Sequence, residues 1–254
     1  MTEALVRYAL EGRVARLTLD SPHNHNALST ALVGQLHQGF DDAVAAGARA
    51  VVLGHTGRTF CAGADLSEAA GRDPGDIAVD RAREMTRLLR AILSAPVPVI
   101  AAVDGHVRAG GMGLVGACDI AVAGPASTFA LTEARIGVAP SIISLTLLPK
   151  LTARAAGRYF LTGEKFGPQE AAAIGLITLA ADDVAGTVGT LTADIAKASP
   201  QGLATSKALT TAGLLAGFDA HAEALTAQSA ELFTSAEARE GMLAFLQKRS
   251  PDWA

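Results

Sequence analysis

Short apolar runs alternate with helical patterns through the first half of the chain. Alternating apolar and polar residues on both sides of Glu11-Gly12-Arg13 predict a β-hairpin over residues 6–19. Short, nearly continuous apolar runs predict buried strands at residues 50–53, 99–103 and 119–123. Apolar residues three or four positions apart predict helices over residues 27–46, 77–93 and 112–117, and from residue 64 onward. From residue 141 to the end the pattern is helical, with breaks at residues 163–168 and 199–200. This order predicts an α/β fold with a helical C-terminal region.

Composition narrows the class of protein. The chain has 254 residues, of which 50% are hydrophobic, so it can bury a large core without disulfides or a structural metal. The net charge of −4 argues against a nucleic-acid partner, because phosphate binding requires a dense basic surface. Cys61 and Cys118 lack metal-ligand spacing, so no metal site is expected. The sequence shows neither a signal-peptide core nor a transmembrane run, and we expect a cytoplasmic protein without a membrane partner.

Two glycine-containing loops carry the candidate chemistry. They span residues 59–66 (TFCAGADL) and 102–114 (AVDGHVRAGGMGL), and each leads from a strand toward a helix. The first N–H groups of a helix have no partner within it, so two such helix starts facing one point form an oxyanion hole. Taken alone, the loops are equally typical of tight packing. Neither matches a phosphate-binding P-loop or the dinucleotide fingerprint.

Together with two later segments, these loops resemble the crotonase (enoyl-CoA hydratase/isomerase) superfamily. The later segments are residues 118–140 (CDIAVAGPASTFALTEARIGVAP) and 240–249 (EGMLAFLQKR). The resemblance implies a spiral of repeated ββα units over residues 1–195 and a helical trimerisation region over residues 196–254. It also implies a homotrimer or a dimer of trimers. An acyl-CoA thioester is the implied substrate in fatty acid metabolism, with no cofactor besides the coenzyme A of that substrate.

The resemblance assigns roles to individual positions. The N–H groups of Ala64 and Gly110 would form the oxyanion hole for the thioester carbonyl. The remaining residues implied to bind the substrate are Asn26, Ala27, Leu28, Ala62, Asp65, Leu66, Gly111 and Lys248. The alternative interpretation of Lys248 is an ordinary solvated side chain. Arg108 could bind a distal carboxylate of the acyl chain, and the alternative is that its side chain points outward and forms a salt bridge.

The glutamates decide which reaction is expected. Hydratases of this superfamily that use two glutamates carry the first at the position of Gly113 here, so that carboxylate is missing. The second is present as Glu133, which we expect to be the general acid and base. Without the resemblance, Glu133 would be read as a surface carboxylate paired with Arg135.

One carboxylate allows two reactions. It can take a proton from water and deliver one to the α-carbon, which is hydration, or move a proton between carbons, which is 3-enoyl to 2-enoyl isomerisation. The flanking residues resemble the branch that contains 3-methylglutaconyl-CoA hydratases, which favours an enoyl-CoA hydratase. Whether the acyl chain is branched, acidic or plain stays open. A non-catalytic acyl-CoA binder is the alternative from another class.

Overall fold

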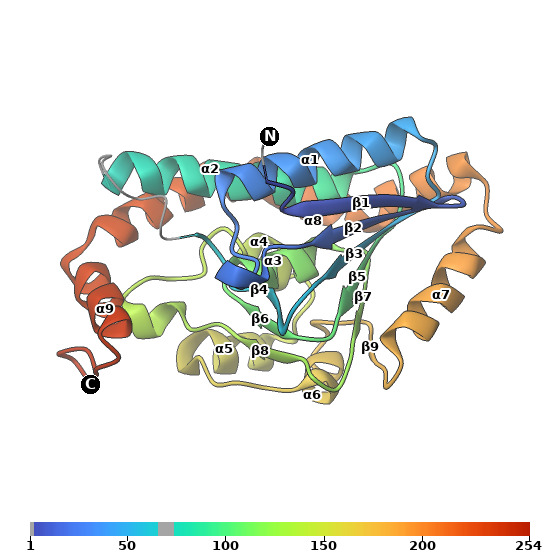
Figure 1. The fold of residues 1–254 in the computed structure, drawn as a ribbon. Coiled ribbons are helices and arrows are strands. Elements are labelled where there is room, and N and C mark those ends of the chain that lie inside the picture. The colour runs from blue at the N-terminus through green and yellow to red at the C-terminus, as the bar shows by residue number, and fades with distance from the viewer. Residues whose placement is uncertain (1–2, 66–73) are drawn as a thin grey trace.

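Nine strands form two sheets in the computed structural model, which describes residues 3–65 and 74–254 (Figure 1). The larger sheet has the order β1-β2-β3-β5-β7-β9, and the smaller has the order β4-β6-β8. Among the strand pairs of the described residues, only the β1–β2 hairpin is antiparallel. The strands are β1 (Val6–Glu11), β2 (Val14–Leu19), β3 (Ala50–His55), β4 (Thr59–Cys61), β5 (Val99–Val103), β6 (His106–Arg108), β7 (Ile120–Ala123), β8 (Thr128–Ala130) and β9 (Leu179–Ala180).

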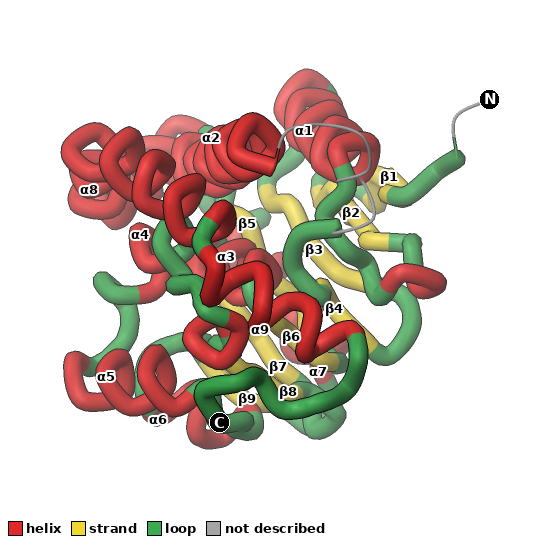
Figure 2. The backbone as a smooth tube through the Cα atoms, turned by 90° about the vertical axis from the view of Figure 1, so that its left-hand side faces the viewer, coloured by secondary structure: helices red, strands yellow, loops and turns green. Residues whose placement is uncertain are grey.

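Helices surround the two sheets on most sides (Figures 1 and 2). The α-helices of the described residues are α1 (Thr30–Ala45), α2 (Pro74–Ser94), α3 (Gly110–Ala117), α4 (Ser144–Leu147), α5 (Ala153–Thr162), α6 (Pro168–Ala173), α7 (Val184–Ile195), α8 (Pro200–Thr234) and α9 (Ala236–Leu246). Two short 3₁₀ helices complete this set, η1 (Pro22–Asn24) and η3 (Glu133–Ile136).

The chain repeats one unit as it winds. A long strand of the larger sheet is followed, after a tight bend, by a short strand of the smaller sheet, as in β3–β4, β5–β6 and β7–β8. At the β5–β6 bend a Cβ atom on Gly105 would lie 2.7 Å from the carbonyl oxygen of Arg58, so only glycine allows this approach. A helix then follows β4 and β6, and η3 follows β8. The predicted spiral of ββα units is confirmed.

The central strands β3, β5 and β7 of the larger sheet are buried on both faces, as parallel strands are. In β3, Val51 and Leu53 point into the main core with α1 and α2, whereas Val52 points to the opposite face. On that opposite face Val52 joins Ile100, Val122 and Val188 of α7. Burial on both faces explains why these strands appear in the sequence as continuous apolar runs.

Several elements differ from the prediction. The strands β4, β6 and β8 were not predicted, because three residues are too few to show alternation. β9 lies within a segment predicted to be helical, but Leu179 and Ala180 pair with β7. The helix predicted from residue 64 falls largely outside the described residues, and Ala64 and Asp65 themselves are not helical. Within residues 3–65 and 74–254, no helix is long and apolar enough to cross a membrane.

The C-terminal region begins with α8, which lies along α2 in both views (Figures 1 and 2). A buried lysine anchors it. The Nζ atom of Lys207 lies 2.8 Å from Oδ2 of Asp119, and it donates hydrogen bonds to the carbonyl oxygens of Ile92 and Val97. The side chains of Lys207 and Asp119 are only 4% and 15% exposed. This ion pair therefore joins α8 to the start of the central strands. The division into domains at residue 195 stays a prediction.

We predict that Lys207→Met lowers the free energy of unfolding by about 3–5 kcal/mol, because it leaves the largely buried Asp119 carboxylate without its positive partner, although the Val99 N–H still donates to it. The matched control is Lys197→Met, which breaks the exposed pair between Lys197 and Asp194 and is expected to change stability by about 0–1 kcal/mol. Urea unfolding followed by circular dichroism measures both. Equal effects of the two substitutions would contradict the anchoring role.

Candidate active site

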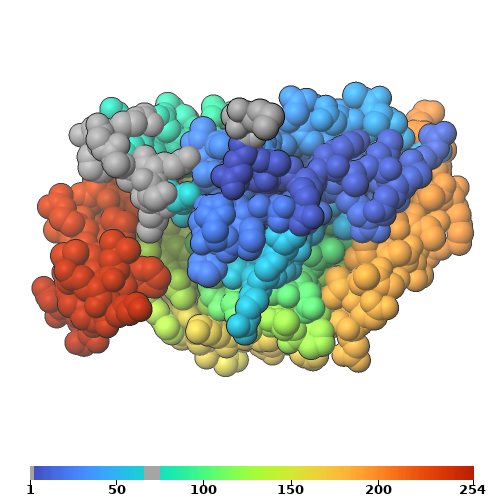
Figure 3. Space-filling view, viewed as in Figure 1, coloured from blue at the N-terminus to red at the C-terminus, as the bar shows by residue number. Residues whose placement is uncertain are grey.

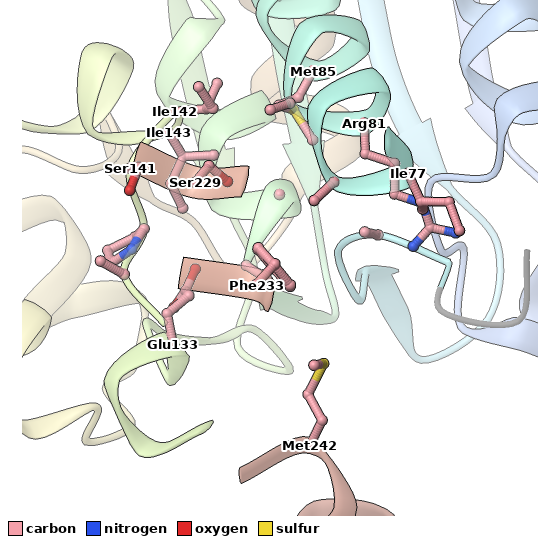
Figure 4. Close-up of a pocket in the computed structure, with 17 residues that line it drawn as sticks. Ile77, Arg81, Met85, Glu133, Ser141, Ile142, Ile143, Ser229, Phe233 and Met242 are labelled. Atoms are coloured by element: carbon pink, nitrogen blue, oxygen red, sulfur yellow. The ribbon is translucent and has the colours of Figure 1, made fainter. Parts of the chain in front are cut away.

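One pocket of about 240 Å³ collects residues from distant parts of the chain. Figure 4 shows Glu133 on one side, Ile77 and Arg81 of α2 across from it, and Met242 of α9 below. Most of the lining is apolar. The lining residues are Ala64, Ile77, Ala78, Arg81, Ala82, Met85, Ala109, Gly110, Glu133, Ala139, Pro140, Ser141, Ile142, Ile143, Ser229, Phe233 and Met242. Among these described residues Glu133 is the one carboxylate.

Glu133 is the first residue of η3 and is buried, with 9% of its surface exposed. Its Oε2 atom has no hydrogen-bond partner among the described residues. Burial removes water from the carboxylate, which disfavours the charged form and raises the pKa of Glu133 from its ordinary value of 4.5 to about 7. A carboxyl group with a pKa near neutrality is suited to both take and return a proton. The alternative pairing with Arg135 is wrong, because that guanidinium donates to the carbonyl oxygen of Thr162.

The two glycine loops touch at the wall of this pocket. A Cβ atom on Gly63 would lie 2.6 Å from Cβ of Ala109 and 3.3 Å from the nitrogen of Gly110. Gly63 also has a φ of +98°, which side-chain-bearing residues rarely adopt. The glycine therefore lets the two backbones approach each other.

One backbone N–H group in each loop takes no part in the local backbone hydrogen bonds of the described residues. Ala64 forms a parallel bridge with Leu28, in which Leu28 donates to the Gly63 carbonyl and accepts from the Asp65 N–H. In such a bridge the N–H of the middle residue, Ala64, points away from its partner strand. Gly110 is the first residue of α3, so its N–H has no carbonyl partner within the helix. Both residues line the pocket that holds Glu133.

The segment around Asn26 holds the first loop in place. Asn26 is fully buried, and its side chain donates to the carbonyl oxygens of Thr56 and Thr59 and accepts from the Ser21 N–H. Its φ of +53° is one that asparagine tolerates better than most residues. Ala62 donates its N–H to the His25 carbonyl. The residues predicted to bind the substrate at positions 26–28 and 62 thus lie side by side.

The other predicted binding residues fall in different places. Gly111 packs beneath the site, where a Cβ atom would lie 2.7 Å from the Cys61 carbonyl oxygen. Asp65 accepts a hydrogen bond from Asn24 through Oδ2. Lys248 is exposed beyond the end of α9 and is not part of the pocket lining. Leu66 lies outside the described residues.

The place of the missing glutamate is filled. A Cβ atom on Gly113 would lie 2.5 Å from Cγ2 of Ile143 and 3.4 Å from Cδ1 of Leu89. Ile143 is also part of the pocket lining. A longer side chain at position 113 would therefore displace Ile143, so the backbone of α3 is covered by an isoleucine where a second carboxylate would stand.

Arg108 does not lie where it could bind a distal carboxylate of the acyl chain. Its guanidinium donates to the carbonyl oxygens of Val107 and Thr128 and to Oγ1 of Thr128, which ties β6 to β8. It is absent from the pocket lining, as is every member of β6 in the described structure.

The contribution of the C-terminal helices to the pocket was not predicted from the sequence. Ser229 and Phe233 of α8 and Met242 of α9 line the pocket, although only an assembly role was predicted for this region. Arg81 of α2 was missed as well. These residues lie far in sequence from both glycine loops, and a helical apolar stripe does not reveal which of its members face a ligand.

Comparison with known proteins fits this geometry. The family model described as "Enoyl-CoA hydratase/isomerase" matches residues 10–254. A Rhodobacter capsulatus protein named "Probable enoyl-CoA hydratase" is 36% identical, with 99% of this chain and 98% of that one covered. The "2,3-dehydroadipyl-CoA hydratase" of Escherichia coli is 32% identical, with 100% and 99% covered. The crystal structure of an enoyl-CoA hydratase from Mycobacterium avium is 65% identical and covers both chains fully, with a TM-score of 0.94. The chain therefore belongs to the enoyl-CoA hydratase/isomerase family, within the crotonase superfamily.

We predict that Glu133→Gln stabilises the fold at pH 8 but barely at pH 5. The raised pKa means that the native state keeps the proton up to about pH 7, whereas the unfolded state loses it near 4.5. The wild type therefore loses stability as the pH rises between these values. Since one pKa unit corresponds to about 1.4 kcal/mol, the gain at pH 8 is at most about 3 kcal/mol. Thermal unfolding at both pH values measures it, with the exposed Glu223→Gln as control. An equal effect at pH 5 and pH 8 would contradict the buried, raised-pKa carboxyl.

Gly113→Glu is expected to destabilise the protein by about 1–3 kcal/mol from overpacking against Ile143, with a further loss from burying a charge. Combining it with Ile143→Gly should recover part of that loss, because the second change vacates the occupied space. The control Gly157→Glu changes an exposed helical glycine that has open space around it. Urea unfolding of the four members of the double-mutant cycle gives the coupling. Additive effects would show that Ile143 does not occupy the space.

Proposed function

We propose that this protein is an enoyl-CoA hydratase that adds water across the 2,3-double bond of an acyl-CoA thioester. Glu133 is its acid and base, and the N–H groups of Ala64 and Gly110 hold the thioester oxygen. The observation that carries the proposal is a single buried carboxylate sharing one pocket with two backbone N–H groups. The hydratase names of relatives over nearly their full lengths support it.

The proposed reaction needs one proton shuttle. The Glu133 carboxylate takes a proton from water as the water oxygen bonds to C3 of the substrate. The electron pair of the double bond moves onto the thioester carbonyl, where the two N–H groups stabilise the enolate oxygen. Each such donor is worth about 2.7–4 kcal/mol in the transition state. Glu133 then returns the proton to C2, and the carboxylate is regenerated.

The coenzyme A moiety is proposed to lie against the backbone of residues 26–28 and Ala62, which the first loop holds together. Lys248 is proposed to approach the phosphates of the nucleotide. The apolar pocket walls, made of Ile77, Met85, Ile142 and Phe233 among others, favour a hydrocarbon acyl chain.

Isomerisation of 3-enoyl-CoA to 2-enoyl-CoA is the second candidate. The observation that favours it is the coverage of Gly113 by Ile143, which leaves one carboxylate and an apolar wall where a two-glutamate site would hold water. In this reaction Glu133 takes a proton from C2 and returns it to C4, and no water is required.

Assembly into a trimer or a dimer of trimers is proposed for the C-terminal region. An open groove between α4 and α8, lined by Leu148, Leu214 and Leu225 among others, supports an interface there. Light scattering of the purified protein gives the mass of the assembly.

A paired turnover assay tests the reaction. One arm offers crotonyl-CoA and 3-methylglutaconyl-CoA, the other a 3-enoyl-CoA, and mass spectrometry follows the products. We expect a gain of water in the first arm, and Glu133→Gln should lower it by about 10²–10⁴-fold while coenzyme A ester binding is kept. Glu223→Gln, an exposed change of the same kind on α8, should leave the rate unchanged.

The outcomes separate the candidates. Conversion of the 3-enoyl ester at unchanged mass, without hydration, would assign the isomerase instead. Binding without turnover in both arms would assign a non-catalytic acyl-CoA binder. Full activity of Glu133→Gln would contradict the role of Glu133 in either reaction.

A further inference from the structure

The short helix that carries Glu133 is packed against α9 with no side chains between the two backbones. A Cβ atom on Gly241 of α9 would lie 2.5 Å from the carbonyl carbon and oxygen of Ile136, the last residue of η3. A Cβ atom on Gly137 would lie 2.6 Å from the carbonyl group of Glu237 and 2.7 Å from the nitrogen of Ala238. The two glycines thus face each other's helices in a reciprocal contact.

The burial pattern agrees with this contact. Gly241 is buried, and Ala238 and Ala244, three residues before and after it, are 0% and 1% exposed. Gly137 has a φ of +76°, as a left-handed cap of η3. Any side chain at Gly241 would push α9 away from η3, and the gap would open beside the residue that begins the same turn, Glu133.

A second contact, from α5, also holds η3. Nε and Nη2 of Arg135 donate hydrogen bonds to the carbonyl oxygen of Thr162, at the end of α5. Within the turn, the N–H of Val138 donates to the Glu133 carbonyl. Since α5 fixes one side of the turn, the contact with α9 decides whether Glu133 is held from both sides or from one.

α9 also reaches the acyl pocket directly. Met242, the residue after Gly241, lines the pocket together with Phe233 of α8 (Figure 4). In the space-filling view the C-terminal residues, in red, form one side of the molecule, and the middle of the chain shows in the recess beside them (Figure 3). The same helix therefore supports the acid/base residue and closes the wall beside it.

We infer that Gly241 and Gly137 are positioning residues, whose direct backbone contact makes helix α9 of the same chain a support that holds Glu133 in place and shields it from bulk solvent. This inference rests on the proposed function, because it assigns a role in that reaction. Loss of the contact lets η3 move and lets bulk water reach the carboxyl group. The proton transfer is then impaired for two reasons, because Glu133 is displaced and because its pKa falls.

The contact is tested with Gly241→Ala in the full-length protein. Alanine is a better helix former than glycine, so α9 itself is not weakened, and only the approach to Ile136 is lost. We expect kcat to fall by about 10- to 100-fold, since a displacement of about 1 Å can have that effect. KM for the enoyl-CoA ester should change much less. The control is Gly189→Ala, the same change at a helical position of α7 with open space, which should leave kcat unchanged.

The pH dependence of kcat distinguishes a positioning role from a general loss of stability, because a loss of stability would not shift the kcat–pH profile. Burial is the largest cause of the raised pKa of Glu133, so entry of water should move the acid limb of the kcat–pH profile to lower pH. Besides Glu133 itself, the charged side chains on η3, on the helices packed against it and across the pocket are Arg81, Arg135, Arg154, Arg158, Glu237, Arg239 and Glu240. None of them is changed by the substitution.

A second variant tests the same contact in case Gly241→Ala does not fold. Gly137→Asn keeps the left-handed backbone, which asparagine tolerates, but places a side chain against Glu237. The same fall in kcat and the same shift in either folded variant support the inference. Wild-type kcat and an unmoved limb in a folded variant would overturn it, and so would misfolding of both variants with Gly189→Ala intact, which would make the contact purely structural. Absence of turnover in the wild type would instead reject the proposed function, and the inference with it.

Discussion

Burial of the Glu133 carboxyl group is the constraint on which the site depends. A carboxylate is strongly hydrated in water, and moving it into an apolar pocket without a positive partner raises its pKa, here to about 7. This apolar environment keeps the pKa raised only if it is rigid, because a mobile Glu133 side chain would come into contact with bulk water. The surrounding elements meet this requirement: η3 is held by α5 through Arg135 and by α9 through Gly241.

The winding of the chain brings the two N–H groups of the proposed oxyanion hole to the same pocket. Each turn of the spiral contains a short strand of the smaller sheet, and these strands are neighbours in the order β4-β6-β8. The residues just after each strand therefore lie next to their counterparts in the next turn. Ala64 comes after β4, Gly110 after β6 and Glu133 after β8. Two N–H donors and one carboxyl group thus come from consecutive turns of one repeated unit.

The sequence predicted the parts of this arrangement that have a local signature. Apolar runs predicted the hairpin and the buried strands. Glycines marked the two loops, where Gly63 and Gly110 permit the close approach of the backbones. Glu133 was identified through the spacing of the family motif. Strands of three residues had no local signature, and β9 was hidden in a helical pattern. The pocket residues Phe233 and Met242 depend on where α8 and α9 fold back, which is a property of tertiary packing.

Gly113 and Ile143 also show what the sequence alone cannot predict about the site. The absence of a glutamate at position 113 was visible in the sequence, but its consequence required coordinates, because only they show that Ile143 fills the space. A single carboxyl group facing an apolar wall is therefore a feature of the packing as well as of the sequence.

The most direct test is the ionisation of Glu133 in the ligand-free protein. Carbon-13 NMR of protein labelled at the glutamate side-chain carboxyl carbons follows each group with pH, and the signal missing from Glu133→Gln identifies the residue. Because Glu133 is buried, we expect its signal to titrate near pH 7, apart from those of the exposed glutamates. A midpoint close to 4.5, together with the exposed groups, would contradict it, because the carboxyl group would then be in contact with water.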